Sequence, residues 1–260
     1  MRKFFRGLAL QAEVVHALVL RETRTRFGAH QLGYVWALAE PILSILTFFV
    51  LFRVLKRGAP EGMDLFSFVA TGLVPYTLFS SSANRVAEAI NGNQALLYYP
   101  QVRPLDLVIA RSVLEAATHG AVFLVLLGVH ALWIQELEID NILLTLLGFI
   151  LAGALGTSLG VVFCFLGQLS NAVERARGPM MRPLFWISGI FFTAASLPDQ
   201  VRDVMLWNPV LHITELVRDG WFVSYSSDHL QVAYVCMWIL ALGTAGLLLE
   251  RLVRKRIELT

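Results

Sequence analysis

The hydrophobic residues of the chain lie in long runs that short polar segments separate. Several runs extend for about 20 residues without a charge, which is the length that an α-helix needs to cross a hydrocarbon core of about 30 Å. The pattern therefore predicts an all-α, polytopic membrane protein with six membrane-spanning helices. The predicted spans are 32–55, 65–83, 105–134, 142–167, 183–197 and 232–249, and the fifth of these is short.

The N-terminal segment has a different pattern, in which apolar residues recur at alternating spacings of three and four. These residues are Phe5, Leu8, Ala12, Val15 and Val19. A stripe of this kind predicts an amphipathic helix that lies in the membrane interface, and a short coiled-coil seam is the alternative. We assign residues 1–31 to this interface helix and its turn, and residues 32–260 to a transmembrane domain.

Segment 198–222 is apolar in places but carries charges, among them Asp203 and Arg218. A charge at the centre of a bilayer costs at least about 2.5 kcal/mol, so this segment is not expected to be a seventh crossing. The Asn208-Pro209 pair is expected to break it into two short helices. We therefore predict a re-entrant helical hairpin between the fifth and sixth spans.

The composition supports a membrane protein, because 57% of the residues are hydrophobic, only 15% are charged and the mean hydropathy is +0.65. A soluble domain would carry about 25% charged residues. The basic residues also indicate an orientation. Of the 21 Lys and Arg residues, 16 lie in the N-terminus, the C-terminus, the segment after the fourth span, and the stretch from the end of the second span to Arg111 at the start of the third. The positive-inside rule then predicts that both termini are cytoplasmic. Six spans agree with this prediction, because an even number of crossings leaves both termini on the same side.

The sequence gives little reason to expect catalysis within this chain. A phosphate-binding P-loop needs a Gly-Lys pair, but Lys3, Lys56 and Lys255 all follow other residues. The two cysteines, Cys164 and Cys236, lie in apolar runs without a metal-ligand spacing. We therefore predict no catalytic residue, no metal site and no bound cofactor in this chain.

Two glycines lie four residues apart in the fourth predicted span, at Gly156 and Gly160. The string 156–160 has the GxSxG spacing of a hydrolase nucleophile, but it lies in the middle of an apolar run rather than at a strand-to-helix turn. Small residues at this spacing allow two helices to approach closely. We therefore interpret the pair as a helix-packing surface.

Polar residues inside the spans are candidates for function. Glu40 directly precedes Pro41 in the first span, where a kink is expected, and it either faces a polar path or is a protonated acid that caps the kink. In the third span Arg111, Glu115 and His119 repeat every four residues, so they share one helix face. This ladder is either functional or a tether between neighbouring helices.

Three stretches together resemble the permease subunits of type 2 ABC exporters. They are RETRTRFGAHQLGYVWALAEP (21–41), LLYYPQVRPLDLVIAR (96–111), and RPLFWISGIFFTAASLP (182–198) followed by LWNPVLHITELVR (206–218). Within that class the sequence is most similar to the capsular polysaccharide exporters of Gram-negative bacteria, and next to the O-antigen exporters. The likeness covers most of the chain.

The resemblance implies three functional segments. The loop 91–104 matches the segment that docks on a separate ATPase subunit, and the turn before the first span matches the region where a lipid-linked glycan enters. Segment 198–222 matches the outward re-entrant helices of the exit gate.

The implied docking residues are Leu96, Leu97, Tyr98, Tyr99 and Arg103. The implied substrate path is lined by Arg24, Arg26, Tyr34, Trp36 and Glu40, although juxtamembrane arginines also bind ordinary anionic lipids. The implied gate residues are Trp207, Asn208, Pro209, His212 and Glu215.

The resemblance also implies the partners and the location. We expect an inner-membrane protein that pairs with a second copy of itself and with an ATPase dimer that holds ATP and Mg. We expect an acidic, lipid-linked polysaccharide as substrate, a periplasmic export partner, and no nucleic acid. Three bases on the outer side, Arg53, Lys56 and Arg57, either reach lipid headgroups or meet the anionic passenger as it leaves.

Three alternatives remain open from the sequence. The same fold permits an ABC exporter of a small molecule or lipid. A membrane-embedded glycan-modifying enzyme would use Glu115 and His119 as acid and base. A secondary transporter would use protonation of Glu40 and depend on a pH gradient.

Overall fold

The computed structural model describes residues 2–27, 32–60, 62–134 and 139–257. All of the regular elements in these ranges are helices, which confirms the predicted all-α class. The α-helices are α1 (Arg2–Phe27), α2 (Leu32–Val54), α3 (Leu65–Ala87), α4 (Pro104–Ile134), α5 (Ile142–Gly167), α6 (Asn171–Ile187), α7 (Asp199–Met205), α8 (Pro209–Trp221) and α9 (Val232–Ile257). Two short 3-10 helices are η1 (Asn91–Tyr98) and η2 (Ala194–Ser196).

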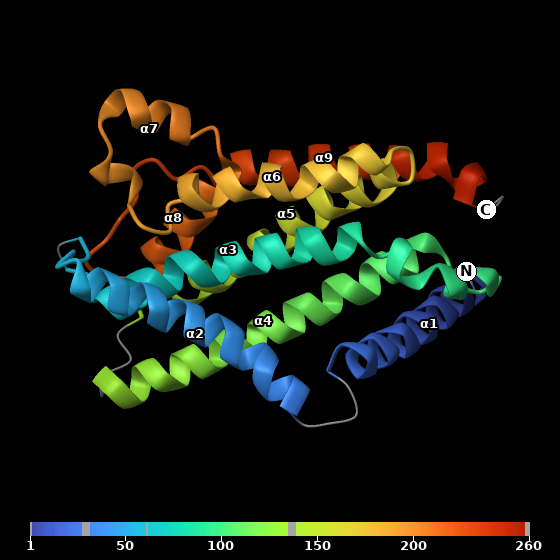
Figure 1. Ribbon diagram of the computed structural model, residues 1–260, viewed down its shortest axis with the longest axis horizontal. Coiled ribbons are helices and arrows are strands. Elements are labelled where there is room, and N and C mark those ends of the chain that lie inside the picture. Colours follow the sequence, from blue (N-terminus) through green and yellow to red (C-terminus); the bar gives the residue numbers. More distant parts are fainter. Residues whose placement is uncertain (1, 28–31, 61, 135–138, 258–260) are drawn as a thin grey trace.

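Helices α3 and α5 form the centre of the molecule. Helix α5 packs against α3, α8 and α9, while α3 also contacts α4 and α8. Helix α1 lies along the first part of α4, and Figure 1 shows that the start of α1, the end of α9 and the connection between α3 and α4 are at the same end of the molecule. Helices α7 and α8 lie at the opposite end. The fold therefore has two distinct ends joined by long helices.

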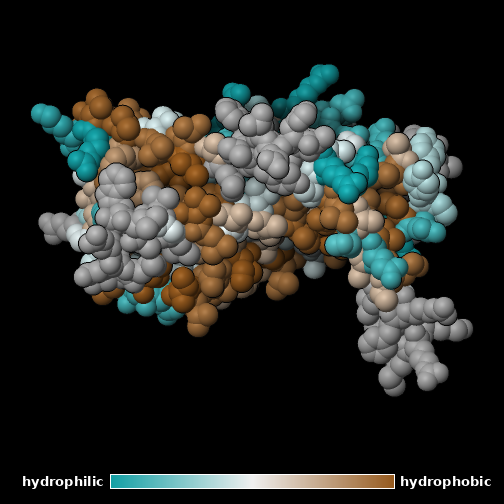
Figure 2. All heavy atoms as spheres, turned by 90° about the horizontal axis from the view of Figure 1, so that it is seen from below, coloured by the Kyte–Doolittle hydropathy of each residue, from teal (hydrophilic) through white to brown (hydrophobic). Residues whose placement is uncertain are grey.

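Within the described residues, four helices are long and apolar enough to cross a membrane. They are Leu65–Ala87, Pro104–Leu126, Ile142–Gly167 and Val232–Val253. Helix α2 corresponds to the first predicted span, but the structure does not describe the side chains of its first turns, 32–38. Apolar side chains cover much of the middle of the face that Figure 2 shows, whereas hydrophilic ones gather at its ends and along its upper edge.

The fifth predicted span, 183–197, is not one continuous helix. Helix α6 begins earlier, at Asn171, and ends at Ile187. The chain then turns at Gly189, whose φ of +73° is a left-handed conformation that favours glycine. A Cβ atom there would lie 2.5 Å from a methyl group of Leu211, so the turn is packed tightly on α8. Sequence hydropathy did not reveal this turn because the residues on both sides of it are apolar.

The predicted break at Asn208 and Pro209 is observed. Asn208 precedes α8, and its side-chain oxygen accepts a hydrogen bond from the backbone N–H of Val210 at 3.0 Å. Its amide nitrogen donates to the Ile187 carbonyl at 3.1 Å. Asn208 therefore caps α8 and ties it to the end of α6.

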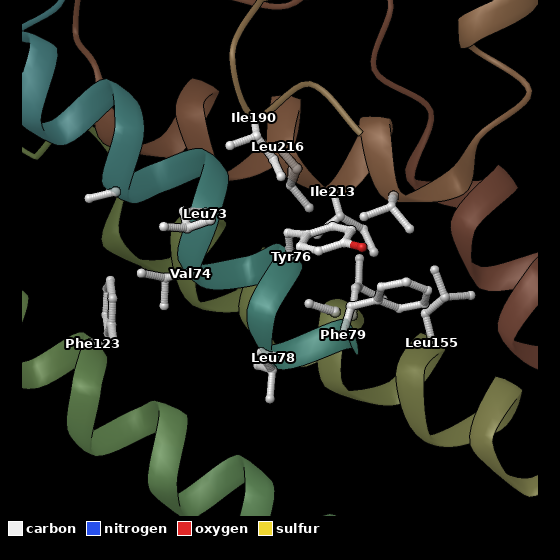
Figure 3. Close-up of a cluster of buried hydrophobic side chains, with 14 of the residues drawn as sticks. Leu73, Val74, Tyr76, Leu78, Phe79, Phe123, Leu155, Ile190, Ile213 and Leu216 are labelled. Atoms are coloured by element: carbon white, nitrogen blue, oxygen red, sulfur yellow. The ribbon is translucent and has the colours of Figure 1, made fainter. Parts of the chain in front are cut away.

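The core lies between α3, α4, α5 and α8, as Figure 3 shows. Tyr76 and Phe79 of α3 point toward α5 and α8, where Leu155 and Ile213 meet them. Phe123 closes the other side of α3 from α4. Helix α3 is thus surrounded by protein, which explains why its apolar residues do not form a single stripe.

The Gly156 and Gly160 pair packs α5 directly on α3. A Cβ atom at Gly156 would lie 2.3 Å from the Phe79 carbonyl oxygen, and one at Gly160 would lie 2.8 Å from the Ala83 carbonyl oxygen. Both obstacles belong to the backbone, which cannot move as a side chain can. The structure therefore supports the interpretation of this pair as a helix-packing surface rather than a hydrolase motif.

We expect Gly156→Ala to destabilise the protein by about 1–3 kcal/mol, because the added methyl group forces α3 and α5 apart. Thermal unfolding in detergent measures this change. The matched control is Gly153→Ala on the same helix, where the new methyl group meets Leu78 at 3.8 Å, an ordinary van der Waals contact. Equal melting temperatures for the two variants would contradict the proposed close packing.

Candidate functional site

The segment between α3 and α4 presents two aromatic side chains at the end of the molecule where the chain begins. Tyr98 and Tyr99 are 81% and 63% exposed. Leu96 and Leu97 are half-buried against the protein's own apolar cluster, which includes Ile90 and Leu107. The predicted docking residues therefore divide into two tyrosines that face outward and two leucines that anchor the segment. We call residues 91–99, the first part of the predicted docking loop 91–104, the coupling segment, after the role that the resemblance implies.

Arg103, the fifth predicted docking residue, is exposed just before α4. Its backbone N–H donates to the Asp106 carboxylate at 2.9 Å, which caps the start of α4. The carboxylate of Asp106 also accepts a hydrogen bond from the Gln11 side chain on α1, at 2.9 Å. The buried Asp106 thus joins the end of the predicted docking loop to α4 and α1.

Polar side chains also tie the coupling segment to α5 and α6. Asn91 accepts a hydrogen bond from Gln168 at 2.7 Å and donates one to Glu174. Nearby, Arg177 forms an ion pair with Glu88, which follows α3. The coupling segment therefore contacts the end of α5 and α6, the helix that leads to α7 and α8.

A cleft of about 290 Å³ opens between α1, α3 and α4. Its lining contains three arginines and two glutamates, together with Thr25 and Leu114. The five charged residues are Glu22, Arg26, Arg85, Arg111 and Glu115. The cleft carries a formal charge of +1 from these five side chains and is the largest concentration of guanidinium groups in the described pockets.

The ion pairs in this cleft link helices that are distant in sequence. Glu115 is 2% exposed and pairs with Arg26 of α1, and Arg85 lies 3.9 Å from the same oxygen. Arg111 pairs with Glu22 at 3.0 Å and donates a hydrogen bond to the Arg85 carbonyl at 2.7 Å. The interactions hold α1 against α4 at the mouth of the cleft.

The predicted ladder along α4 is divided between two sets of partners. Along its own helix Glu115 meets His119, whose Nδ1 lies 3.1 Å from the Glu115 backbone carbonyl oxygen and 3.7 Å from Glu115 Oε2. Arg111 turns instead to Glu22. The four-residue spacing places Arg111, Glu115 and His119 on one face of α4. Glu22 of α1 nevertheless binds the Arg111 guanidinium, because the packing of α1 on α4 brings the two side chains together.

The structure brings together only part of the predicted substrate path. Arg26 lines the cleft, whereas Arg24 is exposed on α1 outside its lining. Glu40 is exposed on α2, and the side chains of Tyr34 and Trp36 lie outside the described part of the chain. Glu22 and Arg85 also line the cleft, although no periodic pattern in the sequence indicates them. Each belongs to the cleft only because α1 and α3 pack on α4.

The predicted gate residues lie at the other end of the molecule, mostly within the protein. Trp207 is 80% exposed, but His212 and Glu215 are 2% and 1% exposed. The Glu215 carboxylate accepts hydrogen bonds from Tyr225, from Ser227 at 2.7 Å and from the backbone N–H of Ala194 at 3.1 Å.

These buried groups stabilise the end of the molecule where α7 and α8 lie rather than present themselves to a ligand. His212 Nε2 lies 2.9 Å from the Leu206 carbonyl, and the ring stacks edge-on against Tyr234. Burial and the neighbouring Glu215 carboxylate raise the pKa of the Tyr225 phenol, so Tyr225 remains a proton donor to that carboxylate.

Residues 13–222 match the ABC-2 type transporter family. The chain is 34% identical to the polysialic acid transport protein KpsM of Escherichia coli over 245 residues, which is 94% of this chain and 95% of that protein. It is 29% identical to the capsule polysaccharide export inner-membrane protein BexB of Haemophilus influenzae, over 98% of this chain and 96% of BexB. It is 28% identical to the capsule polysaccharide export inner-membrane protein CtrC of Neisseria meningitidis, with the same coverage. The family match covers most of the chain, and the resemblance seen in the sequence is confirmed: this protein is a member of the ABC-2 type transporter family.

Proposed function

We propose that this protein is the inner-membrane subunit of an ATP-driven exporter of capsular polysaccharide. The observation that carries the proposal is similarity to three differently named capsule or polysialic acid transport proteins over nearly their entire lengths. A match of this extent includes the coupling segment, the cleft and the outer helices, rather than one shared domain. We assign ATP hydrolysis to a separate subunit.

The two exposed tyrosines support docking of that ATPase. Adjacent aromatic side chains that are 81% and 63% exposed form a surface that favours a protein partner. The leucines beneath them fix the segment to the membrane domain, so a force applied at the tyrosines is transmitted to the rest of the chain. We propose that an ATPase dimer binds this end of a dimer of the present chain, with ATP and Mg in the partner.

The proposed topology has six crossings and cytoplasmic termini. The start of α1, the coupling segment and the end of α9 lie at one end of the molecule, which supports a common cytoplasmic side (Figure 1). Helices α2, α3, α4, α5 and α9 supply five crossings, and α6 with the turn that follows it supplies the sixth. Helices α7 and α8 then form the re-entrant hairpin on the outer side, where a periplasmic partner would receive the product.

The cleft between α1, α3 and α4 supports an anionic, lipid-linked substrate. Arg26, Arg85 and Arg111 place three guanidinium groups at the cytoplasmic end of the spans, and guanidinium groups bind phosphate oxygens strongly. Arg85 is half-exposed, so it is accessible to a ligand. We propose that this cleft is where the lipid-linked end of the polysaccharide enters.

Transport in inverted membrane vesicles tests the proposed function. Vesicles that contain this chain and its co-purified ATPase are expected to take up lipid-linked capsular polysaccharide when ATP is supplied. A non-hydrolysable ATP analogue and vesicles without this chain are the controls. Polysaccharide uptake that follows a pH gradient without ATP would contradict the proposal.

A further inference from the structure

The coupling segment contains a buried kink at Asn93. This residue has φ −139° and ψ 26°, which interrupts the helical geometry of η1, and it is only 5% exposed although its neighbours Gly92 and Gln94 are exposed. Its side-chain nitrogen donates to the Ala89 carbonyl at 3.1 Å. Its side-chain oxygen accepts a hydrogen bond from Arg21 Nη1 at 2.7 Å. The amide is therefore held from both sides, by the end of α3 and by α1.

The arginine that meets Asn93 belongs to the helix that forms one wall of the cleft. Arg21 is followed directly by Glu22, which pairs with Arg111, and by Arg26 just over one turn later, which pairs with Glu115. These three contacts all come from the last two turns of α1, so the same end of this helix lies against both the coupling segment and α4. If Asn93 moves along the axis of α1, the bond to Arg21 pulls α1 with it. The movement then changes the ion pairs that α1 forms with α4 in the cleft.

Apolar packing by itself would not fix the direction of such a movement. Leu18 of α1 lies in the same cluster as Ile90 and Leu107, and Leu96 packs against this cluster. Apolar contacts are non-directional, so α1 could slide over them. A hydrogen bond between a guanidinium and a buried amide oxygen is charge-assisted and directional, and it fixes the register between the two elements.

We propose that Asn93 is a positioning residue that couples the ATPase-docking segment to the cleft through Arg21. Movement of the coupling segment during the ATPase cycle then shifts α1 and changes the cleft that receives the substrate. Neither Asn93 nor Arg21 contacts substrate or nucleotide in this role. The inference rests on the proposed function, because it needs an ATPase at Tyr98 and Tyr99.

The test separates transport from ATP hydrolysis. Asn93→Ala, Arg21→Ala and the double variant are purified with the ATPase, reconstituted, and assayed for polysaccharide transported per ATP hydrolysed. We expect each single variant to lower this ratio about tenfold, the size of a typical coupling between two sites. The double variant is expected to be no worse than either single variant, because all three lack the same bond. Copurification of the ATPase is expected to be unchanged.

Two control variants make the result specific. Gln94→Ala removes an exposed amide from the next position and is expected to keep the wild-type ratio. Arg21→Lys keeps a cationic donor for the Asn93 side-chain oxygen, so it is expected to keep most of the ratio. If Asn93→Ala does not fold, Arg21→Ala carries the test, because Arg21 is an exposed surface residue.

An unchanged ratio in Arg21→Ala would overturn the inference, as would losses in the two single variants that multiply in the double variant. Failure of the proposed function would look different, since wild-type protein would then copurify without an ATPase or transport without ATP.

Discussion

Replacing Arg218 by alanine is expected to destabilise the protein by about 3–5 kcal/mol, which is a large fraction of the stability of a typical domain. Arg218 is completely buried in α8. Its guanidinium donates to the carbonyls of Phe192 at 2.7 Å and Ile190 at 3.0 Å, and to that of Phe68 in α3 at 3.4 Å. It also lies 3.9 Å from Glu215 and 4.2 Å above the Phe68 ring.

The loss is large because the arginine satisfies groups that have no access to water. Alanine would leave the carbonyls of the turn after α6 without these donors and would leave Glu215 as a buried acid without its neighbouring cation. The turn and α8 would then lose the interaction that holds both against α3. The end of the molecule that contains α7 and α8 is expected to loosen first.

Thermal unfolding in detergent and the yield of monodisperse protein measure this effect. The control is Arg202→Ala, which removes an ion pair with Asp199 on α7. The Asp199 side chain is 84% exposed, and such surface ion pairs contribute about 0–1 kcal/mol to stability. Arg218→Lys is expected to be intermediate, because it keeps the charge but not the fork of donors. Similar melting temperatures for Arg218→Ala and Arg202→Ala would show that the buried network does not stabilise the fold.

The paired change Tyr98→Asp and Tyr99→Asp is expected to abolish copurification of the ATPase subunit. Both side chains are exposed, so two carboxylates at these positions remain solvated in the free protein and leave its stability nearly unchanged. In the complex the same carboxylates would be desolvated against the partner. We therefore expect a normal melting temperature and no bound ATPase.

Copurification in mild detergent, followed by an assay of ATP hydrolysis, checks this result. The conservative pair Tyr98→Phe and Tyr99→Phe keeps both rings and is expected to retain the partner. Leu97→Asp is a poorer probe, because Leu97 is half-buried in the protein's own cluster and a charge there would also disturb the fold. Retention of the ATPase by the Asp pair would show that the docking surface lies elsewhere.

Much of the helical framework could be predicted from the order of the residues. The predicted bounds of 32–55 and 142–167 agree closely with α2 and α5, because a long apolar run must satisfy its own backbone hydrogen bonds to reside in a membrane. Asn208 and Pro209 marked the start of α8 because proline and a side-chain cap act locally. The turn at Gly189 escaped prediction because hydropathy does not distinguish a helix from a packed apolar turn.

The sequence by itself determined the fold class, the membrane environment, most helix bounds and the family, since these follow from composition, local periodicity and motif order. Only the tertiary structure decided which charges meet. Arg26 and Glu115 are 89 positions apart, and Arg21 and Asn93 are 72 apart. Arg111 could have paired with Glu115 on its own helix, but the packing of α1 brings Glu22 to it. Electrostatic partners depend on distances between helices, and no local pattern in the chain encodes those distances.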